Sequence, residues 1–218
     1  MITTAYSDFF AGLEKNNSKA WFDEHRKNYE NEVKKPFLEL LSKVIPELTK
    51  YEGQISQNPK DALFRINKDI RFSADKTPYN TLMKAGFSPS GKKSFLPGYY
   101  LGIGSDTIHM GGGLFNVKAP EIKAVRDLIL DETKMFTSIV HSKSFTSMFG
   151  KLSGDVAKRI NKEHQAVLES CPEIAHKQFF AMGKVPLKPW LGKEGLEVEI
   201  MKYFKEISAL NHFLNKAF

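Results

Sequence analysis

The chain has 218 residues, of which 41% are hydrophobic and 26% are charged, and this composition is typical of a globular protein rather than a disordered, collagen-like or coiled-coil chain. No apolar run approaches the roughly 20 residues of a membrane-spanning helix, and the first residues lack the basic and apolar regions of a signal peptide. Cys171 has no second cysteine with which to form an internal disulfide. We therefore expect a cytoplasmic protein with no membrane association.

Positive charge is concentrated in the middle of the chain. Lysine and arginine total 32 against 25 acidic residues, which gives a net charge of +7. Residues 1–60 have equal numbers of basic and acidic residues, whereas residues 61–118 have eight basic residues and four acidic ones. A basic centre can bind an anionic ligand or the phosphates of a nucleic acid. Lysines that only keep a domain soluble would give the same excess.

Residues 1–52 are predicted to be helical. Ser18 is a suitable N-cap for a helix in which apolar residues, among them Trp21 and Tyr29, recur at spacings of three and four. Pro36 suits the first turn of a following helix. We interpret the aromatic residues of this region as core residues, so both Trp21 and Tyr29 are expected to be largely buried.

Strand-like periodicity begins at Leu63. From Leu63 to Phe72, apolar and polar residues alternate, which predicts a strand with one polar face. Lys68 interrupts the apolar side and allows a turn at that point. Thr77 and Pro78 are residue types favoured at a helix start.

The next residues predict a loop and then a β-hairpin. Residues 87–93 have loop-like composition, and alternation on both sides of Ser105 and Asp106 indicates a hairpin around these two residues. Residues 119–218 are predicted to be mainly helical, with clear amphipathic helices after Pro120 and over 196–213. No clear periodicity is present in residues 144–192.

These elements predict an α+β fold, in which a small, mainly antiparallel sheet is flanked by N-terminal and C-terminal helices. We find no internal repeat, low-complexity tract or Pro/Gly-rich linker. The pattern therefore predicts a single domain over residues 1–218, with a strand-rich basic centre at 61–118. Nothing in the sequence indicates an oligomeric state.

Polar side chains are concentrated between residues 65 and 79. They are Arg65, Asn67, Lys68, Asp69, Arg71, Asp75, Lys76 and Tyr79. In an extended segment, alternate residues lie on one face, so Arg65 and Arg71 could together bind a phosphate or carboxylate through bidentate hydrogen bonds. A helix start at Thr77 would add free N–H groups that favour an anion.

The candidate residues divide into two roles. The candidate ligand-binding residues are Arg65, Asn67, Arg71 and Lys76, and the candidate catalytic residues are Asp69, Asp75 and Tyr79. Either carboxylate could transfer a proton or orient an arginine, and the tyrosine hydroxyl is a hydrogen-bond donor. A solvated edge strand with cross-strand Arg-Asp pairs would use the same residues.

Other motifs carry weaker signals. The six histidines include no closely spaced pair and Cys171 has no neighbouring ligand, so no metal site is predicted. His25 is interpreted as a hydrogen-bonded core or rim residue. The glycines at 111–113 indicate close backbone approach or positive φ, because no G-x-S-x-G motif exists to pair with an oxyanion turn. The sequence indicates no cofactor.

The chain resembles an uncharacterised family, domain of unknown function 2461, in several segments. The strongest is FRINKDIRFSADKTPYNT, and the others are FFAGLEKNNSKAWFDEHRKNYENEVKKP, GYYLGI, GGGLF, PEIKAVRDLI and FLNKAF. The resemblance implies a compact single-domain protein whose most characteristic stretch is residues 65–79. It implies no particular activity.

Three functions remain open at this point. The leading hypothesis is a protein that binds or acts on a small anionic ligand bearing phosphate or carboxylate. The second is a structural or interaction protein in which the Arg/Asp cluster is an ion-pair network that stabilises the fold. The third is a module that binds nucleic acid weakly and without sequence preference. Convergence on a concave pocket favours the first, full mutual pairing favours the second, and a flat basic stripe favours the third.

Overall fold

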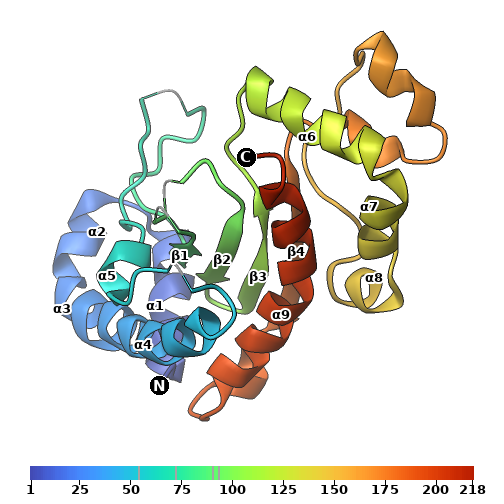
Figure 1. Ribbon diagram of the computed structural model, residues 1–218. Coiled ribbons are helices and arrows are strands. Elements are labelled where there is room, and N and C mark those ends of the chain that lie inside the picture. The colour runs from blue at the N-terminus through green and yellow to red at the C-terminus, as the bar shows by residue number, and fades with distance from the viewer. Residues whose placement is uncertain (54, 72, 90, 93) are drawn as a thin grey trace.

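The computed structural model describes residues 1–218 except residues 54, 72, 90 and 93. At its centre lies a four-stranded antiparallel sheet in the order β1-β2-β3-β4 (Figure 1). The strands are β1 (Met83–Phe87), β2 (Gly98–Ile103), β3 (Thr107–Leu114) and β4 (Phe179–Pro186). Helices precede and follow this sheet, so the fold is α+β with flanking N-terminal and C-terminal helices, as predicted.

The helical segments form three groups along the chain. Before the sheet lie α1 (Thr4–Lys15), α2 (Lys19–Glu24), α3 (Arg26–Asn28), the π-helical turn η1 (Tyr29–Lys34), α4 (Lys35–Thr49) and α5 (Pro59–Ala62). Between β3 and β4 lie α6 (Ala119–Asp131), α7 (Thr133–Val140), α8 (Lys143–Phe149) and the 3-10 turns η2 (Lys162–Val167) and η3 (Pro172–Ala175). After β4 come the 3-10 turn η4 (Lys188–Trp190) and α9 (Leu196–Asn215). Among the described residues, no helix combines the length and apolar character needed to cross a bilayer.

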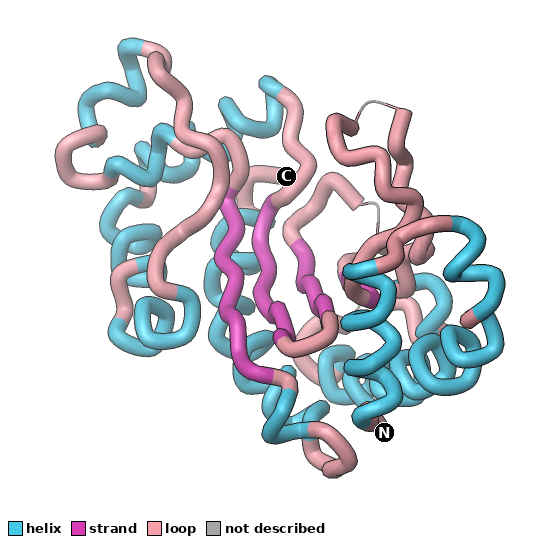
Figure 2. The backbone as a smooth tube through the Cα atoms, turned by 180° about the vertical axis from the view of Figure 1, so that it is seen from behind, coloured by secondary structure: helices cyan, strands magenta, loops and turns pink. Residues whose placement is uncertain are grey.

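The two faces of the sheet have different surroundings. Helix α9 packs on one face, where the Phe204 ring contacts the rings of Phe87 and Tyr99 at centroid distances of 5.7 and 5.1 Å. Viewed from the opposite side, the strands are seen directly, with α9 behind them (Figure 2). On that face the side chains of Tyr100 and Met182 are only half-buried. An antiparallel sheet can leave one face accessible in this way.

Gly112 lies at a close contact between β3, β2 and α9. A Cβ atom at this position would lie 2.6 Å from the Gly98 carbonyl oxygen and 3.1 Å from Ile207 Cγ2. We expect Gly112→Ala to lower the free energy of unfolding by about 1–3 kcal/mol, because added volume in a packed core forces neighbouring atoms apart. Urea unfolding measures the change. Gly53→Ala is the control, because a Cβ there meets nothing within 4 Å; an equal loss in both variants would contradict the close approach.

The N-terminal helices largely follow the prediction. The Ser18 hydroxyl caps α2 by accepting a hydrogen bond from the Trp21 N–H at 3.3 Å, and Pro36 lies in the first turn of α4. Tyr29 is buried as expected. Trp21 is partly buried and packs against the core, although it is not fully enclosed. Its ring packs between the core and the stacked imidazole of His25, whose centroid is 4.0 Å away.

The predicted strand over 63–72 is wrong for the residues that are described; Phe72 lies outside them. The segment makes only isolated bridges, from Leu63 to Ala85 and from Asn67 to Tyr79. Single backbone hydrogen bonds replace a continuous ladder: the N–H of Phe64 donates to the Lys84 carbonyl and the N–H of Lys68 to the Pro78 carbonyl. The turn that Lys68 allowed in the prediction is not formed at that residue.

The predicted helix start at Thr77 and Pro78 is also wrong. The N–H groups that would open a helix are engaged elsewhere: that of Thr77 donates to Asp75 Oδ1 at 2.9 Å, and that of Tyr79 to Asn17 Oδ1 at 3.1 Å. These bonds hold the chain in an extended loop that leads into β1. A helix N-terminus therefore contributes nothing to an anion site here.

Some of the elements predicted after residue 87 are confirmed, and one observed strand was not predicted. The hairpin around Ser105 and Asp106 is confirmed, as are the helices after Pro120 and over 196–213. Strand β4 was not predicted within the mainly helical region, because Phe180 and Met182 on its accessible face are apolar and leave no polar alternation.

Candidate functional site

A cleft of about 800 Å³ lies between the N-terminal helices and the segment that precedes β1. Its walls come from α2, α3, η1, residues 63–71, Tyr79 and Lys92. The charged residues that line it are Arg26, Glu30, Lys34, Arg65, Asp69, Arg71 and Lys92, and the aromatic ones are Phe22, Tyr29, Phe64 and Tyr79. We call this site the cationic cleft, because five of its lining residues are basic and two are acidic.

Arg71 and Asp69 form a bidentate pair at the edge of the cationic cleft. Arg71 Nε donates to Asp69 Oδ1 at 2.9 Å, and Arg71 Nη2 donates to Oδ2 at 2.7 Å. These hydrogen bonds lower the pKa of Asp69 below its ordinary value, so the carboxylate is ionised at neutral pH and has little affinity for a proton. Asp69 therefore suits the orientation of Arg71 better than the role of a general base.

Two other cations of the cleft are paired with acidic side chains. Lys34 Nζ lies 2.8 Å from Glu30 Oε2, one helical turn away. Arg26 pairs with Asp23 and lies over the Phe22 ring, 5.4 Å from its centroid. Both pairs are exposed, so they contribute little to folding and can exchange for an external anion.

Arg65 and Lys92 have no carboxylate partner within hydrogen-bond distance among the described residues. Lys92 Nζ donates to the carbonyl oxygens of Leu63 and Lys60, at 2.5 and 3.3 Å. The exposed guanidinium of Arg65 makes no hydrogen bond or ion pair with the residues that the structure describes; its charge still helps to lower the pKa of Asp69. The positive charge of these two side chains is therefore the least compensated in the cleft.

Aromatic rings form the floor of the cationic cleft. The rings of Phe22 and Tyr79 stack at a centroid distance of 4.1 Å and an angle of 14°. Tyr29 packs beside Phe22 at 5.1 Å, and burial raises the pKa of its hydroxyl to about 12. The main chain of Tyr79 is held on both sides by the Asn17 side chain, which accepts from its N–H at 3.1 Å and donates to its carbonyl at 2.9 Å. The floor thus consists of packed aromatic rings, with the main chain of Tyr79 fixed by Asn17.

Five of the seven residues singled out from the sequence line the cleft. They are Arg65, Asn67, Asp69, Arg71 and Tyr79. Asp75 and Lys76 are not among its lining residues. Their roles in binding and catalysis stay predictions.

Asp75 and Lys76 instead hold the loop that leads back to the cleft. Asp75 Oδ2 accepts from Lys68 Nζ at 2.6 Å, and Oδ1 accepts from both the N–H and the hydroxyl of Thr77. The Lys68 bond, with those from Thr77, lowers the pKa of Asp75 well below its usual range. Lys76 Nζ donates to the Ile70 carbonyl at 3.0 Å. Both side chains are engaged in shaping the loop.

Sequence reasoning did not identify several residues of the cationic cleft, among them Arg26, Lys34, Phe64 and Lys92. Arg26 and Lys34 are two turns apart on one helical face, and this spacing was a usable signal. Lys92 follows Gly91 in the predicted loop over 87–93, whose Lys93 lies outside the described residues. Phe64, on the apolar side of the alternation over 63–72, is half-buried and lines the cleft.

A separate cluster of potential metal ligands lies near α6. The ligand atoms of Asp127, Glu163 and His164 are all within 4.8 Å of one another. The Lys123 ammonium lies 2.7 Å from an Asp127 oxygen and 3.7 Å from a Glu163 oxygen, so a positive charge already lies between the carboxylates. This cluster is better described as an ion-pair network than as a metal site.

Residues 5–213 match the model of a family described as a conserved hypothetical protein (DUF2461). The chain belongs to this family. The resemblance found in the sequence is thus confirmed, and the DUF2461 match includes every residue of the cationic cleft. No curated protein matches the chain. Family membership therefore leaves the function to be argued from the site itself.

Proposed function

We propose that the cationic cleft binds a small anionic ligand that bears a phosphate or carboxylate group. The observation that carries this proposal is that Arg65 and Lys92 have no carboxylate hydrogen-bond partner among the described residues and lie beside a concave aromatic floor. An anion here would gain charge-assisted hydrogen bonds from the guanidinium and the ammonium. Ligand sites commonly combine apolar walls with a few polar groups in this way.

The predicted residues take distinct roles under this proposal. Arg65 and Arg71 bind the anion, Asn67 contributes an amide, and Asp69 fixes the orientation of Arg71. Tyr79 offers a hydroxyl that makes no hydrogen bond with the described residues. A general base is not assigned, so binding is proposed and a reaction is not. The single domain over 1–218 and the cytoplasmic location stay predictions.

The scaffold hypothesis has less support than the binding hypothesis. An ion-pair network stabilises a fold most when its members are buried and fully paired. Asp69 and Arg71 are exposed, as is Arg65, and a cleft is present between them and the helices. Exposed pairs contribute little to stability. The experiment below also tests whether these charged residues bind nucleic acid weakly.

Arg65→Ala should weaken binding of inorganic pyrophosphate by roughly tenfold, because one charge-assisted interaction is lost. Isothermal titration calorimetry at low ionic strength measures the affinity of both proteins. Thermal unfolding should change little, since the side chain is exposed.

Arg159→Ala is the matched control, because Arg159 is exposed and does not line the cleft. Equal loss of pyrophosphate affinity in both variants would mean that only net charge attracts the anion. Binding of a random duplex that is tighter than that of pyrophosphate, with a slope near −0.9 per phosphate against log salt, would favour the nucleic-acid hypothesis.

A further inference from the structure

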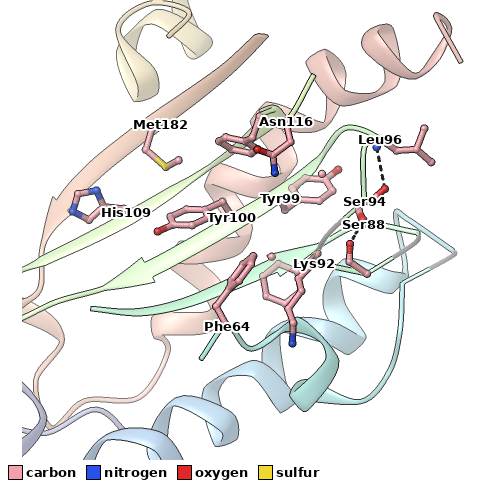
Figure 3. A pocket seen from close by; sticks show the side chains of 15 residues that line it. Phe64, Ser88, Lys92, Ser94, Leu96, Tyr99, Tyr100, His109, Asn116 and Met182 are labelled. Atoms are coloured by element: carbon pink, nitrogen blue, oxygen red, sulfur yellow. Dashed lines mark hydrogen bonds between the residues drawn. The ribbon is translucent and has the colours of Figure 1, made fainter. Parts of the chain in front are cut away.

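A second cavity, of about 400 Å³, lies on the face of the sheet opposite α9. Its walls include Phe64, Lys92, Tyr100, His109, Asn116 and Met182 (Figure 3). We call it the sheet-face pocket. Phe64 and Lys92 also line the cationic cleft. The two cavities are therefore neighbours on either side of these two residues.

The register of the sheet explains why the sheet-face pocket is open. One row across the four strands reads Gly86, Tyr100, Gly111 and Met182, so each large side chain has a glycine neighbour. The two glycines place no side chain of their own beside the tyrosine, and Gly86, Tyr100 and Met182 line the pocket. Phe64 packs over Gly86 and closes one end. The result is a shallow space between rings and a thioether, which suits a flat apolar group.

Three polar groups of the sheet-face pocket have no hydrogen-bond partner in the part of the chain that the structure describes. The Tyr100 hydroxyl, the His109 imidazole and the Asn116 carboxamide make no hydrogen bond with the residues that the structure describes. Burial raises the pKa of Tyr100 to about 12. Burial and the nearby Lys184 lower the pKa of His109. At neutral pH these groups are therefore uncharged donors and acceptors, in contrast to the cationic cleft.

We propose that the sheet-face pocket holds the uncharged planar ring of the ligand whose anionic group lies in the cationic cleft. The ligand class is then a phosphate or carboxylate compound that carries an aromatic or heterocyclic ring with hydrogen-bonding groups. This inference rests on the proposed function, because the anion fixes one end of the ligand. Lys92 lies at the boundary, so its ammonium can contact the group that joins the two parts.

The test compares inorganic phosphate with ring-bearing monophosphates. We expect at least one of phenyl phosphate, adenosine 5′-monophosphate and uridine 5′-monophosphate to bind roughly tenfold or more tightly than inorganic phosphate, because the ring buries additional apolar surface. Titration calorimetry on the full chain supplies the affinities. If none of the three exceeds inorganic phosphate, the inference is overturned.

Two variants assign the extra affinity to the pocket. Met182→Trp places a larger side chain in the wall of the sheet-face pocket, and Tyr100→Ala removes a ring from it. Each variant should abolish the advantage of the ring-bearing probe while binding of inorganic phosphate is unchanged. Two different substitutions are used so that the test can still be made if one of the variants does not fold. An advantage that survives in both folded variants would show that the ring binds elsewhere.

The outcomes separate this inference from the proposed function. If Arg65→Ala weakens inorganic phosphate and the ring adds nothing, the proposed function stands and the inference fails. If Arg65→Ala leaves phosphate binding unchanged, the proposed function fails. In that case, adenosine or uridine binding that is lost in Met182→Trp would still identify the sheet-face pocket as a ring site, but without the anionic end that the inference requires.

Discussion

Tyr79→Ala should lower the free energy of unfolding by about 3–5 kcal/mol, which is the usual cost of truncating a large aromatic residue in a core. The ring is buried and stacks on Phe22, and both rings form the floor of the cationic cleft. Its removal leaves a cavity that Tyr29 and Phe22 can fill only by moving. Urea unfolding followed by circular dichroism measures the change.

Tyr79→Phe keeps the ring and removes only the hydroxyl, so it separates the effects of the two. The Tyr79 hydroxyl makes no hydrogen bond with the described residues, so its removal should change the free energy of unfolding by less than about 0.5 kcal/mol. Any loss of pyrophosphate affinity in Tyr79→Phe then measures the contact of the hydroxyl with the anion. A large stability loss in this variant would mean that the hydroxyl is a structural group and would remove it from the candidate site.

Local signals were sufficient to predict the elements that depend on nearby residues. The cap at Ser18, the proline in the first turn of α4 and the hairpin at Ser105 and Asp106 are formed by residues close in sequence. The α+β class follows from these elements alone. Strand β4 could not be found in this way, because its partner β3 is distant in the chain and both of its faces are largely apolar.

The segment at 63–71 shows why the candidate site was only partly predicted. Alternation placed Arg65, Asn67, Asp69 and Arg71 together, and all four do line the cleft, although the segment is not a strand. The backbone hydrogen bonds that shape it come from residues 78–84, and Asn17 holds Tyr79 from the N-terminal region. Such long-range partners leave no local trace in the sequence.

The roles of Asp69 and Asp75 also could not be predicted from the sequence, because they depend on hydrogen-bond partners that only the structure shows. The sequence makes Asp69 and Asp75 candidate proton-transfer residues. In the structure, hydrogen bonds from Arg71 to Asp69 and from Lys68 to Asp75 lower the pKa of each carboxyl group. Each carboxylate therefore holds a neighbouring side chain in position. Among the described residues, the Arg65 guanidinium and the Tyr79 hydroxyl of the cationic cleft and three polar groups of the sheet-face pocket make no hydrogen bond. This distribution favours ligand binding over proton transfer.

Alkaline solution should destabilise this protein steeply above pH 10. Burial raises the pKa of Tyr6 and Tyr99 well above the ordinary value, and it raises the pKa of Tyr29 and Tyr100 to about 12. Above pH 10 the unfolded tyrosines lose protons that the folded ones keep. The folded state then binds more protons, so the free energy of unfolding falls as pH rises. Each tyrosine contributes up to about 1.4 kcal/mol per pH unit between its unfolded and folded pKa values.

Tyr6→Phe tests this account at one residue. Tyr6 is fully buried, and its hydroxyl donates to the Ile103 carbonyl at 2.9 Å. At pH 8 the variant should lose about 1 kcal/mol with this hydrogen bond. Between pH 10 and 11.5 its urea midpoint should fall less steeply than that of the parent, because phenylalanine has no proton to lose. The two stability curves should therefore converge as pH rises. Parallel curves over that interval would mean that Tyr6 titrates alike in the folded and unfolded chains, and the proton linkage would then lie with the other tyrosines.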